Sequence, residues 1–190
     1  MRKLFSFNMV TVDGFFEGRE HDLSWHKVDA EFNEFAIAQL REIDTLLFGR
    51  TTYQMMANYW PSSEAVKDDP VVAGLMNRMP KIVFSKTLDT AEWSNSSLVQ
   101  SPAEDEISQL KRGSGKDMAI FGSAKLISTL MRTDLIDEHR VMVNPVVLGM
   151  GTPLFQTGDK LKLKLLRTRT FANGNALLIY QFDRQSSKEH

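Results

Sequence analysis

Hydrophobic residues recur along this chain with two periods that alternate. In residues 3–9 apolar and polar side chains alternate, and this pattern predicts a half-buried strand. In residues 29–43 the apolar residues recur every three or four positions, which predicts an amphipathic helix with Asp29 as its N-cap. The apolar run in residues 44–49 predicts a second strand. The chain therefore starts with a strand, a helix and a strand.

The alternation of strand and helix patterns continues to residue 133. Helices are predicted over residues 51–60, which Pro61 ends, and over residues 69–79, where Pro70 stands in a first turn that tolerates proline. Further strands are predicted over residues 81–85 and 117–122, and further helices over residues 101–113 and 123–133. Continuous apolar strands between helices indicate a parallel sheet with helices on both faces.

The last part of the chain has a different pattern. Residues 138–149 read as a strand, and residues 161–182 read as two strands joined across Asn173-Gly174, a strong hairpin signal. The fold class predicted is therefore α/β with three layers: a mostly parallel central sheet, antiparallel C-terminal strands, and helices on both faces. We expect one domain over residues 1–183 and a flexible polar tail over residues 184–190.

Composition excludes several classes of protein. With 190 residues, of which 42% are hydrophobic, the chain has enough material for one core. The chain has no cysteine, which excludes disulfides, thiol catalysis and thiolate zinc sites. A net charge of -1 argues against a nucleic-acid partner. Because no signal peptide or membrane-spanning run is evident, we expect a cytoplasmic protein that acts on a small molecule and not at a membrane.

The junction between the strand at residues 44–49 and the next helix has residues suited to an anion. In an open α/β sheet, ligands bind beyond the carboxyl ends of the strands, where helix N-termini present N–H groups. Here Gly49 leaves room beside the backbone, Arg50 offers a fork of donors, and Thr51 or Thr52 can cap the helix or bind phosphate. The alternative interpretation is an ordinary capped helix with a solvated arginine.

Two further junctions have the same form. Ser85 and Lys86 follow the strand at residues 81–85, and Gly122, Ser123 and Ala124 open the helix at residues 123–133. Three junctions that offer glycine, hydroxyl and cation suit a dinucleotide with several phosphates. The set is more specific than any one of its members.

The order of these motifs resembles a known family. FGRTTYQ, IVFSKTL and AIFGSAKLI are similar to motifs of the dihydrofolate reductase superfamily. Within that superfamily, VTVDGFFEG near the start and LIDEHRVMVNPVVLGMGTPLF near the end resemble the reductase domain of bacterial riboflavin-biosynthesis deaminase-reductases and its stand-alone relatives. The resemblance covers residues 2–182. It implies a dihydrofolate reductase-like fold that binds NADPH, often as a homodimer.

The resemblance also assigns roles to individual residues. It implies that Gly49, Arg50 and Thr51 hold the phosphates of NADPH and that Ser85 and Lys86 surround the adenosine 2'-phosphate. The pyrophosphate cradle would consist of Gly122, Ser123, Ala124 and Lys125. The mobile loop over the nicotinamide would begin with Val12, Asp13 and Gly14. On this basis we expect Gly122→Val to abolish cofactor binding and leave the fold largely intact.

The chain departs from the riboflavin reductases in two ways. Those enzymes usually carry a substrate-contacting glutamate where this chain has Ile120, and no deaminase half with a zinc signature precedes the reductase. We therefore expect a stand-alone NADPH-dependent reductase that transfers hydride to a C=N or C=O bond of a pterin-like or riboflavin-intermediate-like compound, in the manner of a 5-amino-6-(5-phosphoribosylamino)uracil reductase. The alternative is a dinucleotide-binding or regulatory module without turnover.

The proton donor has several candidates. Asp22-Leu23-Ser24-Trp25 is similar to the Asp-Leu-x-Trp of dihydrofolate reductases, whose carboxylate helps to protonate the pterin. An Asp22 enclosed by Trp25, cofactor and substrate would have a raised pKa. Asp29 and Glu31 are alternatives, although helix capping and dipole stabilisation explain them more simply.

Two other patterns have simpler interpretations. His21 and His26 flank Asp22, but no further ligand supports a metal site, so we expect solvated loop histidines. The glycines of residues 148–153 lack the strand-to-helix context of a dinucleotide fingerprint, which favours a turn or a subunit contact. The apolar block at residues 140–155 favours a homodimer.

Overall fold

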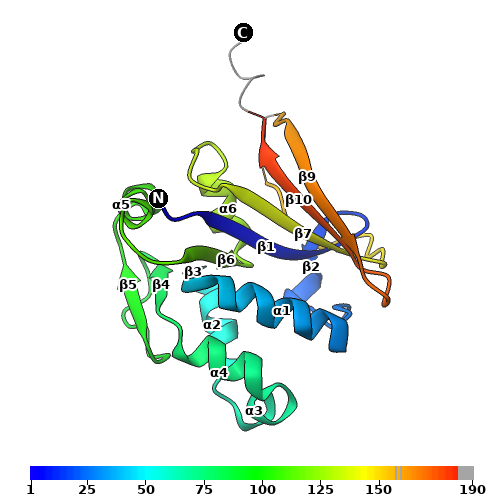
Figure 1. Cartoon of the computed structure of the whole chain (residues 1–190), viewed down its shortest axis with the longest axis horizontal. Coiled ribbons are helices and arrows are strands. Elements are labelled where there is room, and N and C mark those ends of the chain that lie inside the picture. Colours follow the sequence, from blue (N-terminus) through cyan, green and yellow to red (C-terminus); the bar gives the residue numbers. More distant parts are fainter. Residues whose placement is uncertain (157, 159, 184–190) are drawn as a thin grey trace.

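A computed structural model describes residues 1–156, 158 and 160–183, and the predicted tail lies outside these residues. Its main sheet has eight strands in the order β5-β4-β3-β6-β1-β7-β10-β9 (Figure 1). The strands are β1 (Leu4–Thr11), β2 (Phe15–Glu17), β3 (Ile43–Gly49), β4 (Lys81–Phe84), β5 (Ser96–Val99), β6 (Asp117–Phe121), β7 (Glu138–Asn144), β8 (Thr152–Pro153), β9 (Leu163–Thr170) and β10 (Ala176–Phe182). The helices are α1 (Ala30–Glu42), α2 (Arg50–Tyr59), α3 (Ser63–Asp68), α4 (Pro70–Arg78), α5 (Ala103–Arg112) and α6 (Ala124–Leu130).

The predicted fold class is confirmed by the pairing of these strands. From β5 to β7 all neighbours are parallel, whereas β10 is antiparallel to both β7 and β9. The predicted hairpin joins β9 to β10, with Gly174 at a φ of 90° in its turn. β1 lies between β6 and β7, so the first strand of the chain lies in the middle of the sheet, whereas the last two strands lie at one side of it.

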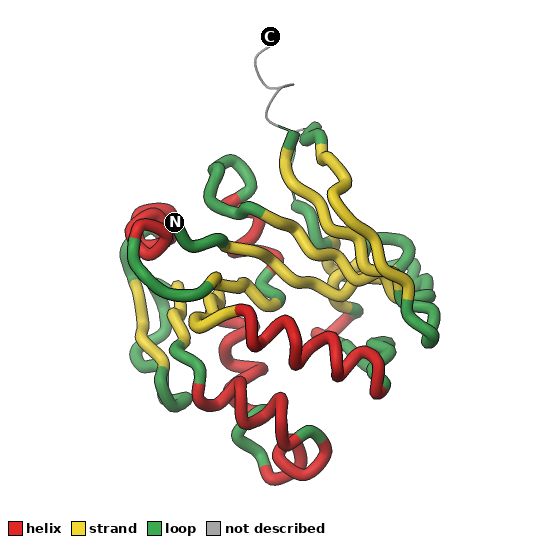
Figure 2. Tube along the Cα trace, in the orientation of Figure 1, coloured by secondary structure: helices red, strands yellow, loops and turns green. Residues whose placement is uncertain are grey.

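Helices cover both faces of the sheet, as predicted (Figure 2). Leu4 and Phe5 are neighbours in β1 and point to opposite faces, because successive side chains of a strand alternate. Leu4 belongs to the cluster that contains α5 and α6, and Phe5 to the cluster that contains α1, α2 and α4. The continuous apolar strands are therefore buried on both faces of the sheet.

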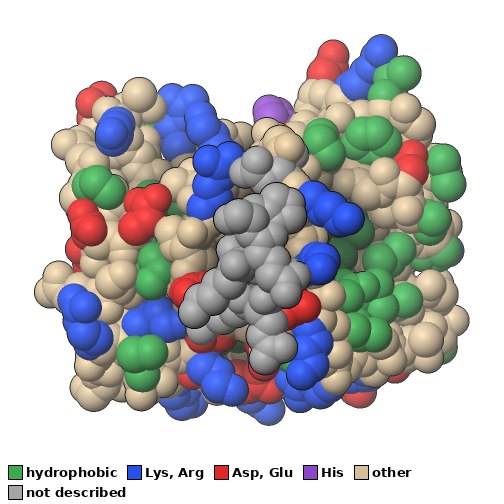
Figure 3. Space-filling view, turned by 90° about the horizontal axis from the view of Figure 1, so that it is seen from above, with side chains coloured by type: hydrophobic (Ala, Val, Ile, Leu, Met, Phe, Trp, Pro, Cys, Tyr) green, Lys and Arg blue, Asp and Glu red, His purple; other side chains and the backbone are tan. Residues whose placement is uncertain are grey.

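Within the described residues, five elements were not predicted from the pattern: β2, the 3-10 helix η1 (Arg19–His21), α3, β5 and β8. Each is six residues or shorter, and the strands among them are defined by their pairing: β5 with β4, and β2 with the distant β8. The strand predicted over residues 138–149 ends at Asn144, since Pro145 cannot donate a hydrogen bond to a ladder. No helix among the described residues combines the length and hydrophobicity that a membrane span requires. On the face in Figure 3, acidic and basic side chains are interspersed.

Candidate active site

The three predicted junctions lie side by side at one edge of the sheet. β4, β3 and β6 are adjacent parallel strands, so their carboxyl ends point to the same edge. The Gly49 N–H donates a hydrogen bond of 3.1 Å to Ser123 Oγ. Arg50 Nη1 donates one of 2.8 Å to Thr87 Oγ1. These bonds join the start of α2 to the other two junctions.

This edge has the donors that phosphate groups require. Neither α2 nor α6 has a side-chain hydrogen bond at its N-cap, so their first-turn N–H groups have no side-chain cap. Arg50, Thr51, Lys86 and Lys125 are exposed around these helix starts, whereas Ala124 is buried. A dinucleotide with several phosphates fits this donor set.

The glycines and serines of the junctions also hold the junctions together. A Cβ on Gly49 would lie 2.4 Å from Ser123 Oγ, so the Ser123 hydroxyl occupies the space beside Gly49. Gly122 has a φ of 70°, and a Cβ there would lie 3.0 Å from Thr52 Cγ2. Ser85 Oγ accepts hydrogen bonds from the N–H groups of Thr87 and Leu88, which order the turn that presents Lys86. Both glycines are therefore required by packing within the protein.

Two residues at this edge were not singled out from the sequence. Thr87 receives the hydrogen bond from Arg50, and its signal was its place within IVFSKTL. Phe16 lies in β2, and its Cζ would be 3.4 Å from a Cβ on Gly122. Only the folded arrangement brings Phe16 to this junction. By contrast, Ile120 is fully buried in the cluster that contains α5 and α6, so this position faces the core.

Val12, Asp13 and Gly14 form a turn that is tied to a distant segment. The Val12 N–H donates 2.9 Å to Val146 O, and Gly14 has a φ of 84°. The Asp13 carboxylate accepts hydrogen bonds from the Thr11 hydroxyl at 2.6 Å and from the Gly149 N–H at 2.8 Å. The Thr11 bond is the main cause that lowers the pKa of Asp13. Asp13 therefore points to the segment after β7.

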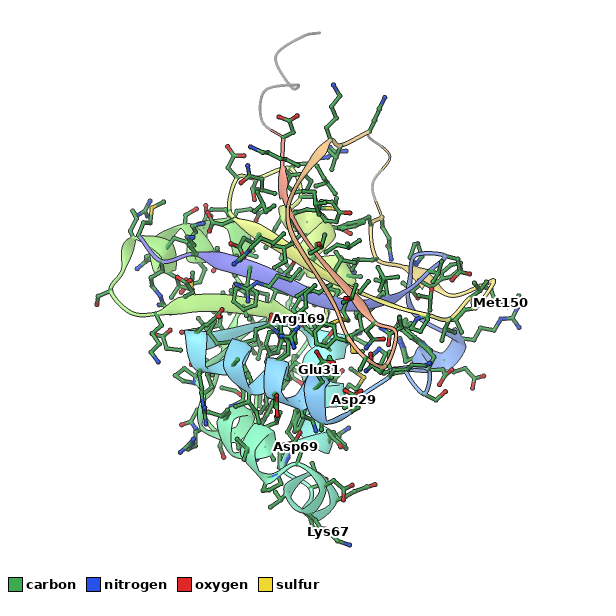
Figure 4. All side chains as sticks on the ribbon, turned by 45° about the vertical axis from the view of Figure 1, so that its right-hand side comes forward. Asp29, Glu31, Lys67, Asp69, Met150 and Arg169 are labelled. Atoms are coloured by element: carbon green, nitrogen blue, oxygen red, sulfur yellow. The ribbon has the colours of Figure 1, made fainter. Side chains whose placement is uncertain are left out.

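The three candidate acids differ in their surroundings. Asp22 is exposed, and Ser24 N–H donates 2.9 Å to its Oδ1. This bond lowers the pKa of Asp22. The chain without ligands therefore does not have the raised pKa that is expected for an enclosed carboxylate. Asp29 caps α1 by accepting from Phe32 N–H, as predicted. Glu31 accepts from Ala172 N–H and Arg169, which lower its pKa (Figure 4).

The histidines of this loop are not both solvated. His21 is exposed and lies 2.8 Å from Glu17, but His26 packs edge-on against Trp25, and its Nε2 is buried without a partner. Burial lowers the pKa of His26 to about 4. The prediction of a solvated His26 is therefore wrong, because the tertiary packing of the loop covers it. No group of metal-binding side chains occurs among the described residues.

The end of the same loop is fixed through main-chain atoms. Lys27 N–H donates 2.9 Å to Asn144 Oδ1. Lys27 O accepts from the amides of Asn175 at 2.9 Å and Asn173 at 3.3 Å. Three asparagines thus hold one peptide position between β7 and the β9–β10 hairpin.

An open cavity of about 670 Å³ lies elsewhere in the molecule. It is lined by Lys3, Asp137, Glu138 and Phe182, at the amino ends of β1 and β7. This is the opposite edge of the sheet from the three junctions. We identify the candidate site by the donors that converge at the three junctions and not by the volume of this cavity.

Comparison with known proteins finds a family and two relatives that match nearly the whole chain. A model of the RibD C-terminal domain matches residues 2–177. The uncharacterized protein YyaP of Bacillus subtilis (strain 168) is 33% identical over 92% of each chain, and YwjB of the same organism is 28% identical over 90% of this chain and 92% of YwjB.

Solved structures share the fold at low sequence identity. A diaminohydroxyphosphoribosylaminopyrimidine deaminase/5-amino-6-(5-phosphoribosylamino)uracil reductase from Thermotoga maritima has a TM-score of 0.67 at 14% identity, over 96% of this chain and 57% of that one. Dihydrofolate reductase from Enterococcus faecalis, complexed with NADP(H), has a TM-score of 0.64 at 15% identity, over 95% of this chain and 96% of that one.

Proposed function

This chain belongs to the RibD C-terminal domain family, and on that premise we propose that it is an NADPH-dependent reductase of a small heterocyclic compound. The observation that carries the proposal is the convergence of three strand ends. The N-termini of α2 and α6 and the turn after β4 present N–H groups, hydroxyls and cations at one edge. The dihydrofolate reductase of the same fold is complexed with NADP(H).

Each part of the edge has a proposed role. Arg50, Thr51 and the first turn of α2, beside Gly49, would hold phosphates of the cofactor. Ser85 and Lys86 would surround the 2'-phosphate. Arg50 lies near them because its guanidinium donates a hydrogen bond to Thr87. The pyrophosphate would lie at Gly122, Ser123, Ala124 and Lys125. Residues 12–14 would begin the loop over the nicotinamide.

When bound, the cofactor supplies the hydride, and the protein supplies position and exclusion of water. The acceptor would be a C=N or C=O bond of a pterin-like or riboflavin-intermediate-like ring. We propose that Asp22, which carries a lowered pKa and is ionised at neutral pH, accepts a hydrogen bond from an N–H group of this ring. Substrate and cofactor that enclose Asp22 would raise its pKa and allow it to pass a proton to the acceptor.

One observation favours a second candidate function. Asp29 and Glu31 serve as cap and ion-pair partner, and Asp22 is exposed, so the chain by itself presents no buried acid among these three. A dinucleotide-binding or regulatory module without turnover would need none. Turnover with an acceptor separates the two candidates, because only the reductase consumes NADPH.

The cofactor is tested by comparing NADPH with NADH. Charge-assisted bonds from Arg50 and Lys86 to a 2'-phosphate predict a Kd for NADPH at least about tenfold below that for NADH, since one such bond contributes about 1.5–3 kcal/mol. Quenching of tryptophan fluorescence measures both constants. Lys86→Met should reduce the preference, whereas Lys67→Met on α3 should keep it. Equal constants for the two nucleotides would contradict the assignment.

The role of Asp22 is tested once an acceptor turns over. Asp22→Asn keeps the shape and removes the acid, so we expect turnover to fall by about 10²–10⁴-fold while the Kd for NADPH stays the same. Asp29→Asn and Glu31→Gln are the matched variants, and their turnover should change little. Full activity of Asp22→Asn with an unchanged pH profile would show that the proton comes from elsewhere, such as a bound water.

A further inference from the structure

The turn Leu148–Gly151 has a geometry that the proposed function does not use. Gly149 has a φ of 74° and Gly151 a φ of 158°, so the backbone here takes shapes that favour glycine. Two successive N–H groups of the turn, those of Leu148 and Gly149, donate to the Asp13 carboxylate at 3.3 Å and 2.8 Å. The turn therefore forms a small anion receptor that an aspartate from the same chain fills.

The segments on both sides of the turn are also joined to the N-terminal loop. Val12 N–H donates to Val146 O at 2.9 Å, and Leu154 N–H donates to Gly14 O at 3.2 Å. Next to the Gly14–Leu154 bond, β2 pairs with β8 in an antiparallel ribbon. A Cβ on Gly151 would lie 2.2 Å from Glu17 O, so this glycine allows the two backbones to approach. Residues 12–17 and 146–154 thus form one unit.

This unit reaches the edge of the sheet where the three junctions meet. Phe16 in β2 lies beside Gly122, where its Cζ would be 3.4 Å from an added Cβ. Its ring also packs against the apolar cluster that contains α6. A displacement of residues 12–17 would therefore remove the side chain that covers the β6–α6 junction.

We infer that Asp13 is a positioning residue, which together with the turn Leu148–Gly151 forms a latch that holds residues 12–17 against the β6–α6 junction. That this junction binds NADPH rests on the proposed function. The latch itself rests on the contacts of Asp13, Gly151 and Phe16. Its carboxylate is engaged by donors of the chain itself, Thr11, Leu148 and Gly149, and it acts through the loop that it holds.

Amide hydrogen exchange of the whole chain without ligand tests the latch. Asp13→Asn keeps the size of the side chain but places an amide group among three donors. We expect exchange in peptides of residues 12–17 and of residues 146–154 to become roughly threefold to tenfold faster together. Glu20→Gln, an exposed change a few residues away, is the matched control and should leave both segments unchanged.

A second variant approaches the latch from its other side. Gly151→Ala would place a Cβ against Glu17 O, and we expect it to speed exchange in residues 12–17 although it lies far from them in sequence. Asp13→Asn should lower the urea midpoint only slightly, by the free energy that corresponds to the factor expected in exchange, because Asp13 is exposed and the change removes native hydrogen bonds but no core contact. It should also raise the Kd for NADPH by up to the same factor, since the cofactor must first order the loop.

The outcomes separate the latch from the proposed function. If Asp13→Asn leaves exchange in residues 12–17 unchanged, or if all peptides of the chain exchange faster together, the latch is wrong. If the native chain binds NADPH and Asp13→Asn binds it equally well, the positioning role is wrong. If the native chain does not bind NADPH, the proposed function fails, and the exchange result decides the latch by itself.

Discussion

Gly122 shows how one backbone angle restricts a single residue. Its φ of 70° and the nearness of Thr52 and Phe16 mean that a side chain would be strained and would push on both neighbours. The expectation that Gly122→Val leaves the fold intact therefore needs correction. The glycine supports the junction itself as well as any ligand that lies there.

We predict that Gly122→Ala lowers the free energy of unfolding by about 1–2 kcal/mol and weakens NADPH binding, because the left-handed conformation is costly for alanine. Gly122→Val should cost more. Urea denaturation followed by circular dichroism gives the stability, and a nucleotide titration gives the Kd. Gly74→Ala is the control, since an added Cβ in that helix meets nothing within 4 Å and should not destabilise. Unchanged stability of Gly122→Ala would contradict the packing argument.

Lys81 is a second residue whose surroundings decide its behaviour. It is 1% exposed, and its Nζ donates to Met79 O at 2.7 Å, Ser94 O at 2.9 Å and Asn77 O at 3.2 Å. The Trp93 ring centroid lies 4.3 Å from Nζ. Three acceptors match the three hydrogens of an ammonium group, although burial lowers the pKa of Lys81 to about 8. The ammonium therefore predominates at neutral pH.

This lowered pKa predicts a change of stability with pH. Between the folded value of about 8 and the ordinary value of 10.5, the unfolded chain binds more protons than the folded chain, so stability rises with pH. The contribution of Lys81 is at most about 1.4 kcal/mol per pH unit. Urea midpoints from pH 7 to 10.5 should show this rise in the native chain and in Lys67→Met, but less of it in Lys81→Met. An identical slope in Lys81→Met would exclude this explanation.

Elements differ in how far their own residues specify them. α1 is long, periodic and capped by Asp29, and β3 is a nearly continuous apolar run, so residues 29–49 indicate both elements directly. β5 consists of Ser96–Val99 and is a strand only because β4 lies beside it. β2 and β8 pair across more than a hundred residues of chain. Short strands of this kind have no periodic signal, since their partners are set by the fold.

The candidate site likewise has features that the sequence predicts and features that depend on the whole fold. That Gly49, Ser85 and Gly122 share one edge follows from parallel strands, whose carboxyl ends point the same way. The partners of individual side chains do not follow from local pattern. Asp13 binds Gly149, and Glu31 binds Arg169, each more than a hundred residues away. The burial of His26 likewise depends on Trp25 and on how the loop packs.

The molecule as a whole has an open edge. β9 ends the sheet, all but its first residue are exposed, and Leu165 and Leu166 are 49% and 37% exposed. The apolar block of residues 140–155 is divided: β7 lies in the core, whereas Val147 and Met150 are 70% and 49% exposed. Met150 projects from its turn in Figure 4. Exposed apolar side chains on an end strand favour association with a partner.

We predict a homodimer, in which a second copy of the chain covers this surface. Light scattering at micromolar concentration should give about twice the 21.6 kDa of one chain. Leu165→Lys should shift the mass toward one chain, whereas Val71→Lys, an equally exposed change on α4, should not. A mass near 21.6 kDa for the native chain would contradict the prediction.

The anchoring of Lys27 has a consequence for how this architecture can diversify. Asn144, Asn173 and Asn175 bind only the N–H and C=O of position 27, so every residue except proline can stand there. The segment between β2 and this peptide is thus fixed at both of its ends. Residues 19–24 of this segment can therefore vary, whereas Trp25 packs with Met9 of β1 and Phe32 of α1 and has to stay for these elements to keep their places. New side chains at residues 19–24 would change the surface that this loop offers to a ligand and leave the scaffold as it is.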